Sequence, residues 1–242
     1  MGRPGGALAS RPVHFFWVVD CSGSMEGTKI GAVNDTIQEV TPIMKKTAED
    51  NPNAQLLVRA LQFSDGASWI ADMVNIEDFH WQDLQAGGMT DIGEAFNLLA
   101  GQLSMPPMPQ RALPPVIVLL SDGQPTDDYK PALERLLKLP WYKKSVRIAI
   151  AIGDDADNSV LEQFTRNKEL VLNVHTRTQL VKAIRWASTV AASVSAPSVQ
   201  SIPVSNDDAD NNDLIQTNAP PELDSPNLDD NSDIGDDDDF KS

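Results

Sequence analysis

The chain is poor in cysteine and histidine and has no long hydrophobic run. One cysteine and three histidines occur in its 242 residues. A single cysteine excludes a fold built on disulfide bonds and favours a reducing compartment. The apolar runs are too short to span a membrane, and the first ten residues, MGRPGGALAS, contain no apolar signal core. We therefore expect a cytoplasmic protein that does not bind a membrane.

Basic residues are also scarce, with 19 Lys and Arg against 35 Asp and Glu and a net charge of −16. Nucleic acids and anionic membranes bind basic faces, so this composition argues against both as partners. Residues 196–242 carry −12 of the charge and few large apolar side chains, which predicts a disordered acidic tail. We expect a flexible N-terminus at 1–10 and one α/β domain at 11–195, a length that supports an independent core.

Short continuous apolar runs predict strands buried on both faces of a parallel sheet. The expected strands are 13–19, 55–63, 67–74, 115–120, 146–152 and 170–174. The turn residues Ser64, Asp65 and Gly66 join the second and third strands as a hairpin. Apolar residues at helical spacing predict helices at about 28–48, 92–103, 131–140, 159–165 and 178–193. The prediction is a doubly wound, mostly parallel six-stranded sheet with one antiparallel edge strand and helices on both faces.

Oxygen-bearing side chains gather in three loops of this predicted fold. Asp20, Ser22 and Ser24 follow the first strand in DCSGS, Thr90 lies in GGMTD, and Asp122 follows a central strand in LLSDG. Ligands of open α/β sheets bind outside the carboxyl ends of the strands. Mg²⁺ takes oxygen ligands and keeps several waters, so the three hydroxyls would bind it directly and the two carboxylates through water. The pattern predicts a Mg²⁺ site that accepts an outside carboxylate, with Mn²⁺ and Ca²⁺ as alternatives.

Each loop taken alone also fits a turn or a helix cap. Asp91 and Glu94 match a capping box, which would leave the Thr90 hydroxyl free. Cys21 is expected to be a small buried side chain rather than a reactive thiol. Acidic residues at 127–128 and 154–157 should lie on the same face, and helix capping is favoured there over a second cation site.

Common catalytic motifs are absent. The residues around Ser22 and Ser24 do not match the G-x-S-x-G nucleophile elbow, and Gly23 and Gly27 are too close for a phosphate-binding loop. The three histidines form no metal-binding motif. We expect a binding module rather than an enzyme. Two alternatives stay open: a metal-dependent hydrolase or phosphatase with Asp20 or Asp122 as base, and a scaffold whose metal is only structural.

The ordered set D-x-S-x-S, then T, then D resembles the metal-ion-dependent adhesion site (MIDAS) of the von Willebrand factor A family, and the resemblance spans roughly residues 11–195. Residues 120–128, 152–157 and 184–188 are similar to bacterial tellurite-resistance-associated (TerY-like) proteins. This resemblance implies a stress-response setting and partners such as TerD-like proteins, protein kinases or phosphatases. The subfamily often carries a further C-terminal metal-binding region. That region is missing from this sequence, which has an acidic tail without cysteine instead.

The acidic tail contains isolated apolar residues, namely Leu214, Ile215, Leu228 and a Phe240 that follows four aspartates. Such segments can fold on binding to a basic groove. We hypothesise that a tail aspartate competes with the partner carboxylate for the open metal position.

Overall fold

The computed structural model describes residues 11–51, 54–154 and 156–195, together with Pro220, Pro221, Leu223 and Phe240. The expected flexible N-terminus at 1–10 lies outside the described residues. So does the expected tail at 196–242, apart from those four positions.

The sheet has six strands in the order β3-β2-β1-β4-β5-β6. The strands are β1 (Arg11–Asp20), β2 (Ala54–Ser64), β3 (Gly66–Asn75), β4 (Val116–Ser121), β5 (Val146–Ile152) and β6 (Val171–Val174). All neighbours pair in parallel except β2 and β3, which form the antiparallel edge. The predicted mixed sheet with one antiparallel edge strand is confirmed. The hairpin turns at Asp65, with Ser64 paired to Gly66.

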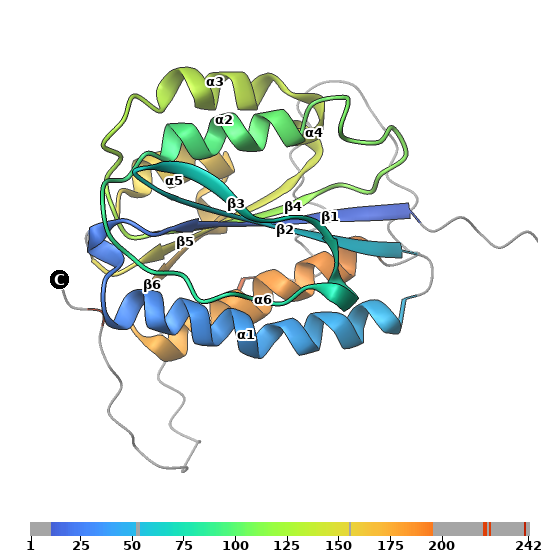
Figure 1. Ribbon diagram of the computed structural model, residues 1–242, viewed down its shortest axis with the longest axis horizontal. Coiled ribbons are helices and arrows are strands. Elements are labelled where there is room, and N and C mark those ends of the chain that lie inside the picture. The colour runs from blue at the N-terminus through green and yellow to red at the C-terminus, as the bar shows by residue number, and fades with distance from the viewer. Residues whose placement is uncertain are drawn as a thin grey trace, which may run out of the picture.

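Helices cover both faces of the sheet (Figure 1). The helices are α1 (Thr28–Glu49), α2 (Ile92–Gln102), α3 (Lys130–Lys138), α4 (Pro140–Lys144), α5 (Asn158–Thr165) and α6 (Arg177–Ser195), with short 3-10 turns η1 (Gly23–Met25), η2 (Ile76–Asp78) and η3 (Lys168–Leu170). α1 and α6 lie on one face, and α2, α3, α4 and α5 lie on the other. The predicted helix that ends near Pro140 is followed by the additional short helix α4.

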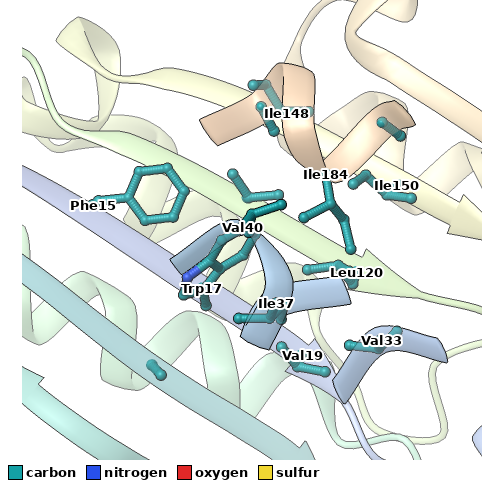
Figure 2. Packing of buried hydrophobic residues seen from close by; sticks show 14 of the residues in the cluster. Phe15, Trp17, Val19, Val33, Ile37, Val40, Leu120, Ile148, Ile150 and Ile184 are labelled. Carbon is teal, nitrogen blue, oxygen red and sulfur yellow. The ribbon is translucent and has the colours of Figure 1, made fainter. Parts of the chain in front are cut away.

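Alternating side chains of β1 divide the core into two layers. Phe15, Trp17 and Val19 pack toward α1 and α6 (Figure 2), whereas Phe16 and Val18 pack toward α2. All of these side chains are fully buried. Burial of each contributes roughly 1.5–3 kcal/mol, which fixes β1 at the centre of the sheet.

In the sheet, β1 lies between β2 and β4. The chain therefore runs from β1 to one side of the sheet through β2 and β3, and then returns to the other side of β1 with β4. Val19 pairs with Leu120 in the parallel register, so both strands reach the same edge of the sheet. Strand order reverses between β1 and β4, and crevices open at such switch points. The loops after Asp20 and Ser121 therefore meet there.

A buried polar pair lies near the opposite end of β1. His14 and Arg59 are 1% and 2% exposed, and Arg59 Nη1 donates to His14 Nδ1 at 2.7 Å. Arg59 also bonds Asp72 at 3.1 Å and lies over the Phe16 ring. Burial, and secondarily the Arg59 charge, lowers the pKa of His14 from 6.5 to about 4.

The lowered pKa of His14 predicts a loss of stability in mild acid. Between pH 6.5 and about 4 the unfolded chain protonates His14 while the folded chain keeps it neutral. The free energy of unfolding should therefore fall as pH decreases through this window, by at most about 3 kcal/mol. Denaturant titrations of the wild type and His14→Gln, which keeps an acceptor for Arg59, measure this effect. A pH dependence that is unchanged in His14→Gln would contradict it.

Candidate metal centre

Asp20 is fixed between the two central strands. Its Oδ1 accepts the Ser22 backbone N–H at 2.8 Å, and its Oδ2 accepts the Ser121 hydroxyl at 2.6 Å. The Asp20 side chain is fully buried. The turn after β1 and the last residue of β4 therefore hold this carboxylate in one orientation.

A chain of hydrogen bonds connects the two serines of the first loop to the loop after β4. Ser22 Oγ and Ser24 Oγ lie 3.0 Å apart, and Ser24 Oγ donates to Asp122 Oδ1 at 2.7 Å. The other Asp122 oxygen accepts from Lys29 Nζ at 2.7 Å. Because the Ser24 hydroxyl donates its one hydrogen to Asp122, it accepts from Ser22 Oγ and keeps one lone pair for a further partner.

Thr90 reaches the same place from the third loop. Its backbone N–H donates to Thr126 Oγ1 at 2.8 Å, and the Thr126 N–H donates back to the Thr90 carbonyl at 3.0 Å. A Cβ on Gly123 would lie 3.2 Å from Ser24 Oγ, 3.4 Å from Thr90 Oγ1 and 3.8 Å from Ser22 Oγ. The three hydroxyls therefore converge beside a residue that has no side chain.

The structure thus brings together all five residues that the sequence singled out. Asp20, Ser22, Thr90 and Asp122 are buried, and Ser24 is exposed, so the site is open to solvent on one side. Their role as metal ligands stays a prediction.

The predicted Asp91–Glu94 capping box is wrong. Asp91 stands at the N-terminus of α2 but makes no capping bond; its carboxylate accepts from the Gly66 N–H at 2.8 Å and from Thr126 Oγ1 at 3.3 Å. Asp127 caps α2 instead, accepting the Gly93 N–H at 2.8 Å. A cap from the loop after β4 ties the Thr90 and Asp122 loops together.

Sequence reasoning missed Ser121 and Lys29 as parts of the site. Ser121 is the last residue of β4 and directly precedes Asp122. That position, beside a predicted ligand at a strand end, was the signal that could have identified it. Lys29 lies at the start of α1, and nothing in its local pattern shows that its ammonium reaches Asp122. Only the packing of α1 against the sheet reveals that contact.

The site holds more negative than positive charge. Lys29 balances Asp122, but the donors that Asp20 has among the described residues are neutral. Burial raises the pKa of Asp20, an effect that the bonds from Ser121 and Ser22 oppose and the nearby Asp122 charge reinforces. A buried carboxylate without a counter-charge is costly, so a cation at this position would stabilise the ionised form.

Cys21 plays no chemical part in this arrangement. The thiol is 3% exposed, and burial raises its pKa to about 12. The nucleophilic thiolate is therefore scarce at neutral pH. The expected small buried side chain is confirmed.

Two other acidic residues on this edge have structural partners, and Asp155 of the same cluster lies outside the described residues. Asp157 caps α5 by accepting the Ser159 N–H at 2.9 Å, as expected, and Asp154 bonds His175 Nδ1 at 2.7 Å. Across the described parts of the chain, no three His, Cys, Asp or Glu side chains gather in a way that could hold a metal. The arrangement around Gly123 differs from such clusters because hydroxyls supply most of its oxygens.

These residues fit a hard divalent cation. Ser22, Ser24 and Thr90 offer three converging neutral oxygens, and two carboxylates stand behind them. Mg²⁺ favours such oxygen donors together with water. The hydroxyls would hold the ion, and Asp20 and Asp122 would orient its waters.

Gly123→Ala tests this convergence. The new methyl group would crowd Ser24 Oγ at 3.2 Å without backbone strain, because Gly123 does not have a positive φ. We expect magnesium affinity to fall roughly tenfold, since displacing a ligand or its support costs 10–100-fold. Gly101→Ala is the matched control, because nothing lies within 4 Å of a Cβ there. Equal calorimetric affinities for both variants would contradict the proposed position.

None of the helices in the described part of the chain combines the length and apolar character needed to cross a membrane.

Solved structures with the same fold come from archaea, bacteria and animals. VWA2 of Sulfolobus acidocaldarius matches with 20% identity and a TM-score of 0.55, covering 74% of this chain and 46% of that one. A von Willebrand factor type A protein from Catenulispora acidiphila has 18% identity and a TM-score of 0.56, with coverage of 76% and 43%. Proximal thread matrix protein 1 of the mussel byssus, solved with a zinc-occupied MIDAS motif, has 18% identity and a TM-score of 0.56, with coverage of 76% and 48%. The matched region spans less than half of each of these proteins.

No curated protein sequence matches this chain. The model of the von Willebrand factor type A domain matches residues 16–186, which include the second half of β1, every candidate ligand and the first half of α6. The chain therefore belongs to the von Willebrand factor type A domain family.

Proposed function

We propose that this protein is a metal-dependent interaction module that binds an acidic residue of a protein partner. The observation that carries the proposal is the convergence of the Ser22, Ser24 and Thr90 hydroxyls beside Gly123, in front of a buried Asp20 carboxylate whose partners in the described part of the chain are neutral. Family members are commonly metal-dependent protein-interaction modules, and the mussel protein holds zinc in its MIDAS motif. Both facts support a divalent ion here.

Each residue has a distinct part in this proposal. The bound ion would supply an electrophilic position for the partner carboxylate. Asp122 orients Ser24 by accepting a hydrogen bond from its hydroxyl, and the Ser22 N–H and Ser121 hydroxyl orient Asp20. Neutral hydroxyl ligands leave the ion with more positive charge than carboxylate ligands would. Exposed Ser24 marks the side from which a partner approaches.

We further propose a bacterial stress-response setting of the tellurite-resistance type, in the cytoplasm. The TerY-like runs at 120–128, 152–157 and 184–188 support it. Candidate partners are then TerD-like proteins, kinases or phosphatases that present a carboxylate. The chain's own acidic tail is a candidate competitor for the same position.

Calorimetric titration of Mg²⁺, Mn²⁺ and Ca²⁺ into chelator-stripped protein tests the metal, and partner capture with each ion or with chelator tests the interaction. We expect saturable binding of one ion per chain and capture that requires it. Absence of saturable binding by the wild type would overturn the proposal. Capture that is unaffected by chelator would favour the scaffold alternative, in which the metal only stiffens the loops.

We propose that the protein is not an enzyme. None of the described histidines bonds to the five site residues: His14 is near the start of β1, and His175 pairs with Asp154. Cys21 is buried. Magnesium-dependent turnover of an aryl phosphate that disappears in Asp20→Ala would instead establish the hydrolase alternative.

A further inference from the structure

Phe240 is a buried aromatic residue that is distant in sequence from the rest of the core. Its side chain is 3% exposed and packs into the hydrophobic cluster between the sheet and helices α1 and α6. The domain from β1 to α6 ends at Ser195. A large apolar side chain therefore returns to the core from a segment that is otherwise rich in aspartate.

The backbone of Phe240 is also bound to the domain. Its N–H donates to the carbonyl of His175, the residue after β6, at 2.9 Å. Its carbonyl oxygen lies 3.5 Å from the position of a Cβ on Gly153, the residue after β5. Phe240 therefore lies at the carboxyl edge of the sheet, the edge that carries the candidate metal centre.

A cleft surrounds this contact. Phe240 lines it together with Thr28, Gly31, Ala32 and Asp35 of α1 and Arg177 of α6. Arg177 Nη2 bonds Asp35 Oδ2 at 2.9 Å and so bridges the two helices across the cleft. Gly31 and Ala32 are small and leave room beside α1, and the ion pair lies at the solvent-exposed side of the cleft.

Leu223 provides a second anchor from the same segment. Its carbonyl accepts the Gln179 side-chain N–H at 2.9 Å, and its side chain packs against the same cluster as Phe240. The Gln179 oxygen accepts the backbone N–H groups of His175 and Thr176 at 2.7 and 3.2 Å. The N-terminus of α6 thus presents an oriented donor to Leu223.

The cleft adjoins the candidate metal centre through Gly153. Lys29 Nζ lies 3.3 Å from the same Cβ position that Phe240 approaches. Lys29 is the residue that pairs with Asp122. The docked segment and the metal-site ion pair are therefore packed against one glycine.

We propose that the cleft between the N-terminal ends of α1 and α6 is an intramolecular docking site for the carboxyl-terminal segment of this chain, with Phe240 as its anchoring side chain. Docking holds the acidic segment at the metal-bearing edge, where a partner carboxylate would arrive. The four residues before Phe240 are aspartates, and the cleft is lined by Arg177, which is paired with Asp35. Docking is a contact within the chain and does not depend on metal binding.

Amide exchange measured by NMR on the full chain tests the docking. In the wild type, the residue 240 amide should exchange at least roughly tenfold slower than in an unstructured chain, because it is bonded to the His175 carbonyl. In Phe240→Ala this protection should be lost, and the melting temperature should fall by roughly 3 °C. The amides of β1 should remain protected in both proteins, since the substitution leaves the sheet intact.

Ile234→Ala is the matched control, because it removes an apolar side chain from the same segment and keeps Phe240. It should retain the slow exchange at residue 240. Exchange at the unstructured rate in the wild type, or equal protection in wild type and Phe240→Ala, would overturn the proposal. Protection that increases with protein concentration would place Phe240 of a second copy in the cleft and would also overturn it. Magnesium affinity is measured separately, so failure of docking is distinguishable from failure of the metal site.

Discussion

Ser22→Ala is expected to abolish saturable magnesium binding at millimolar concentrations while leaving the fold intact. The hydroxyl is one of three that converge beside Gly123, and its loss removes one of the three proposed neutral ligands. Loss of a group that only supports a ligand costs 10–100-fold in affinity, so loss of a ligand should cost at least roughly 100-fold. The Ser22 backbone N–H still bonds Asp20 in the variant, so the loop keeps its conformation.

Calorimetry of the chelator-stripped variant measures this effect, and denaturant unfolding checks the fold. The free energy of unfolding without metal should change by about 1 kcal/mol or less, as for one hydrogen bond. Ser104→Ala is the control, because the Ser104 hydroxyl donates to the Ala100 carbonyl in α2, away from the three loops. Wild-type magnesium affinity in Ser22→Ala would show that the hydroxyl is not a ligand.

Lys29→Met is expected to lower the stability of the metal-free protein by about 3–5 kcal/mol, the typical cost of leaving one partner of a buried ion pair alone. The Lys29 and Asp122 side chains are 8% and 0% exposed, and their charged atoms are 2.7 Å apart. With saturating Mg²⁺ the loss should be much smaller, because the ion supplies positive charge beside Asp122. Metal affinity itself should increase, since a competing cation is removed.

Denaturant titrations in chelator and in Mg²⁺ measure the two parts of this prediction. Lys46→Met is the control on the same helix, because Lys46 is exposed near the end of α1 and should change stability little. Adding Asp122→Asn to Lys29→Met should recover most of the stability in chelator. Equal losses with and without Mg²⁺ would show that the ion does not bind beside Asp122.

Local sequence patterns predict the strands because the burial that each strand requires is visible in its own residues, although the strands pair over long distances in the chain. The run at 13–19 is apolar on both faces, which is the requirement of a central parallel strand, and the structure has β1 there. The turn residues between 63 and 67 predicted the antiparallel hairpin in the same way. The loops that carry Asp20 and Asp122 lie together because β1 and β4 are neighbouring parallel strands, and such strands end at the same edge of the sheet.

Contacts between distant segments were the part that local patterns could not predict. Asp127 caps a helix that begins 35 positions earlier in the chain, in place of the adjacent Asp91. The sequence around Lys29 indicates only a helix. Its contact with Asp122 depends on how α1 packs against the loop after β4. In the sequence Phe240 is one of several isolated apolar residues, because the surroundings that bury it come from two helices and two strand ends.

The separation of Asp20 and Ser121 in the chain also has a consequence for biosynthesis. These residues are hydrogen-bonded but 101 positions apart. As the chain leaves the ribosome, β1, β2 and β3 are synthesised first, and the first loop stays incomplete until β4 pairs with β1. A nascent chain that ends before Val116 thus displays the serines without Asp122, and the ion is expected to bind only after the central pair of strands has formed.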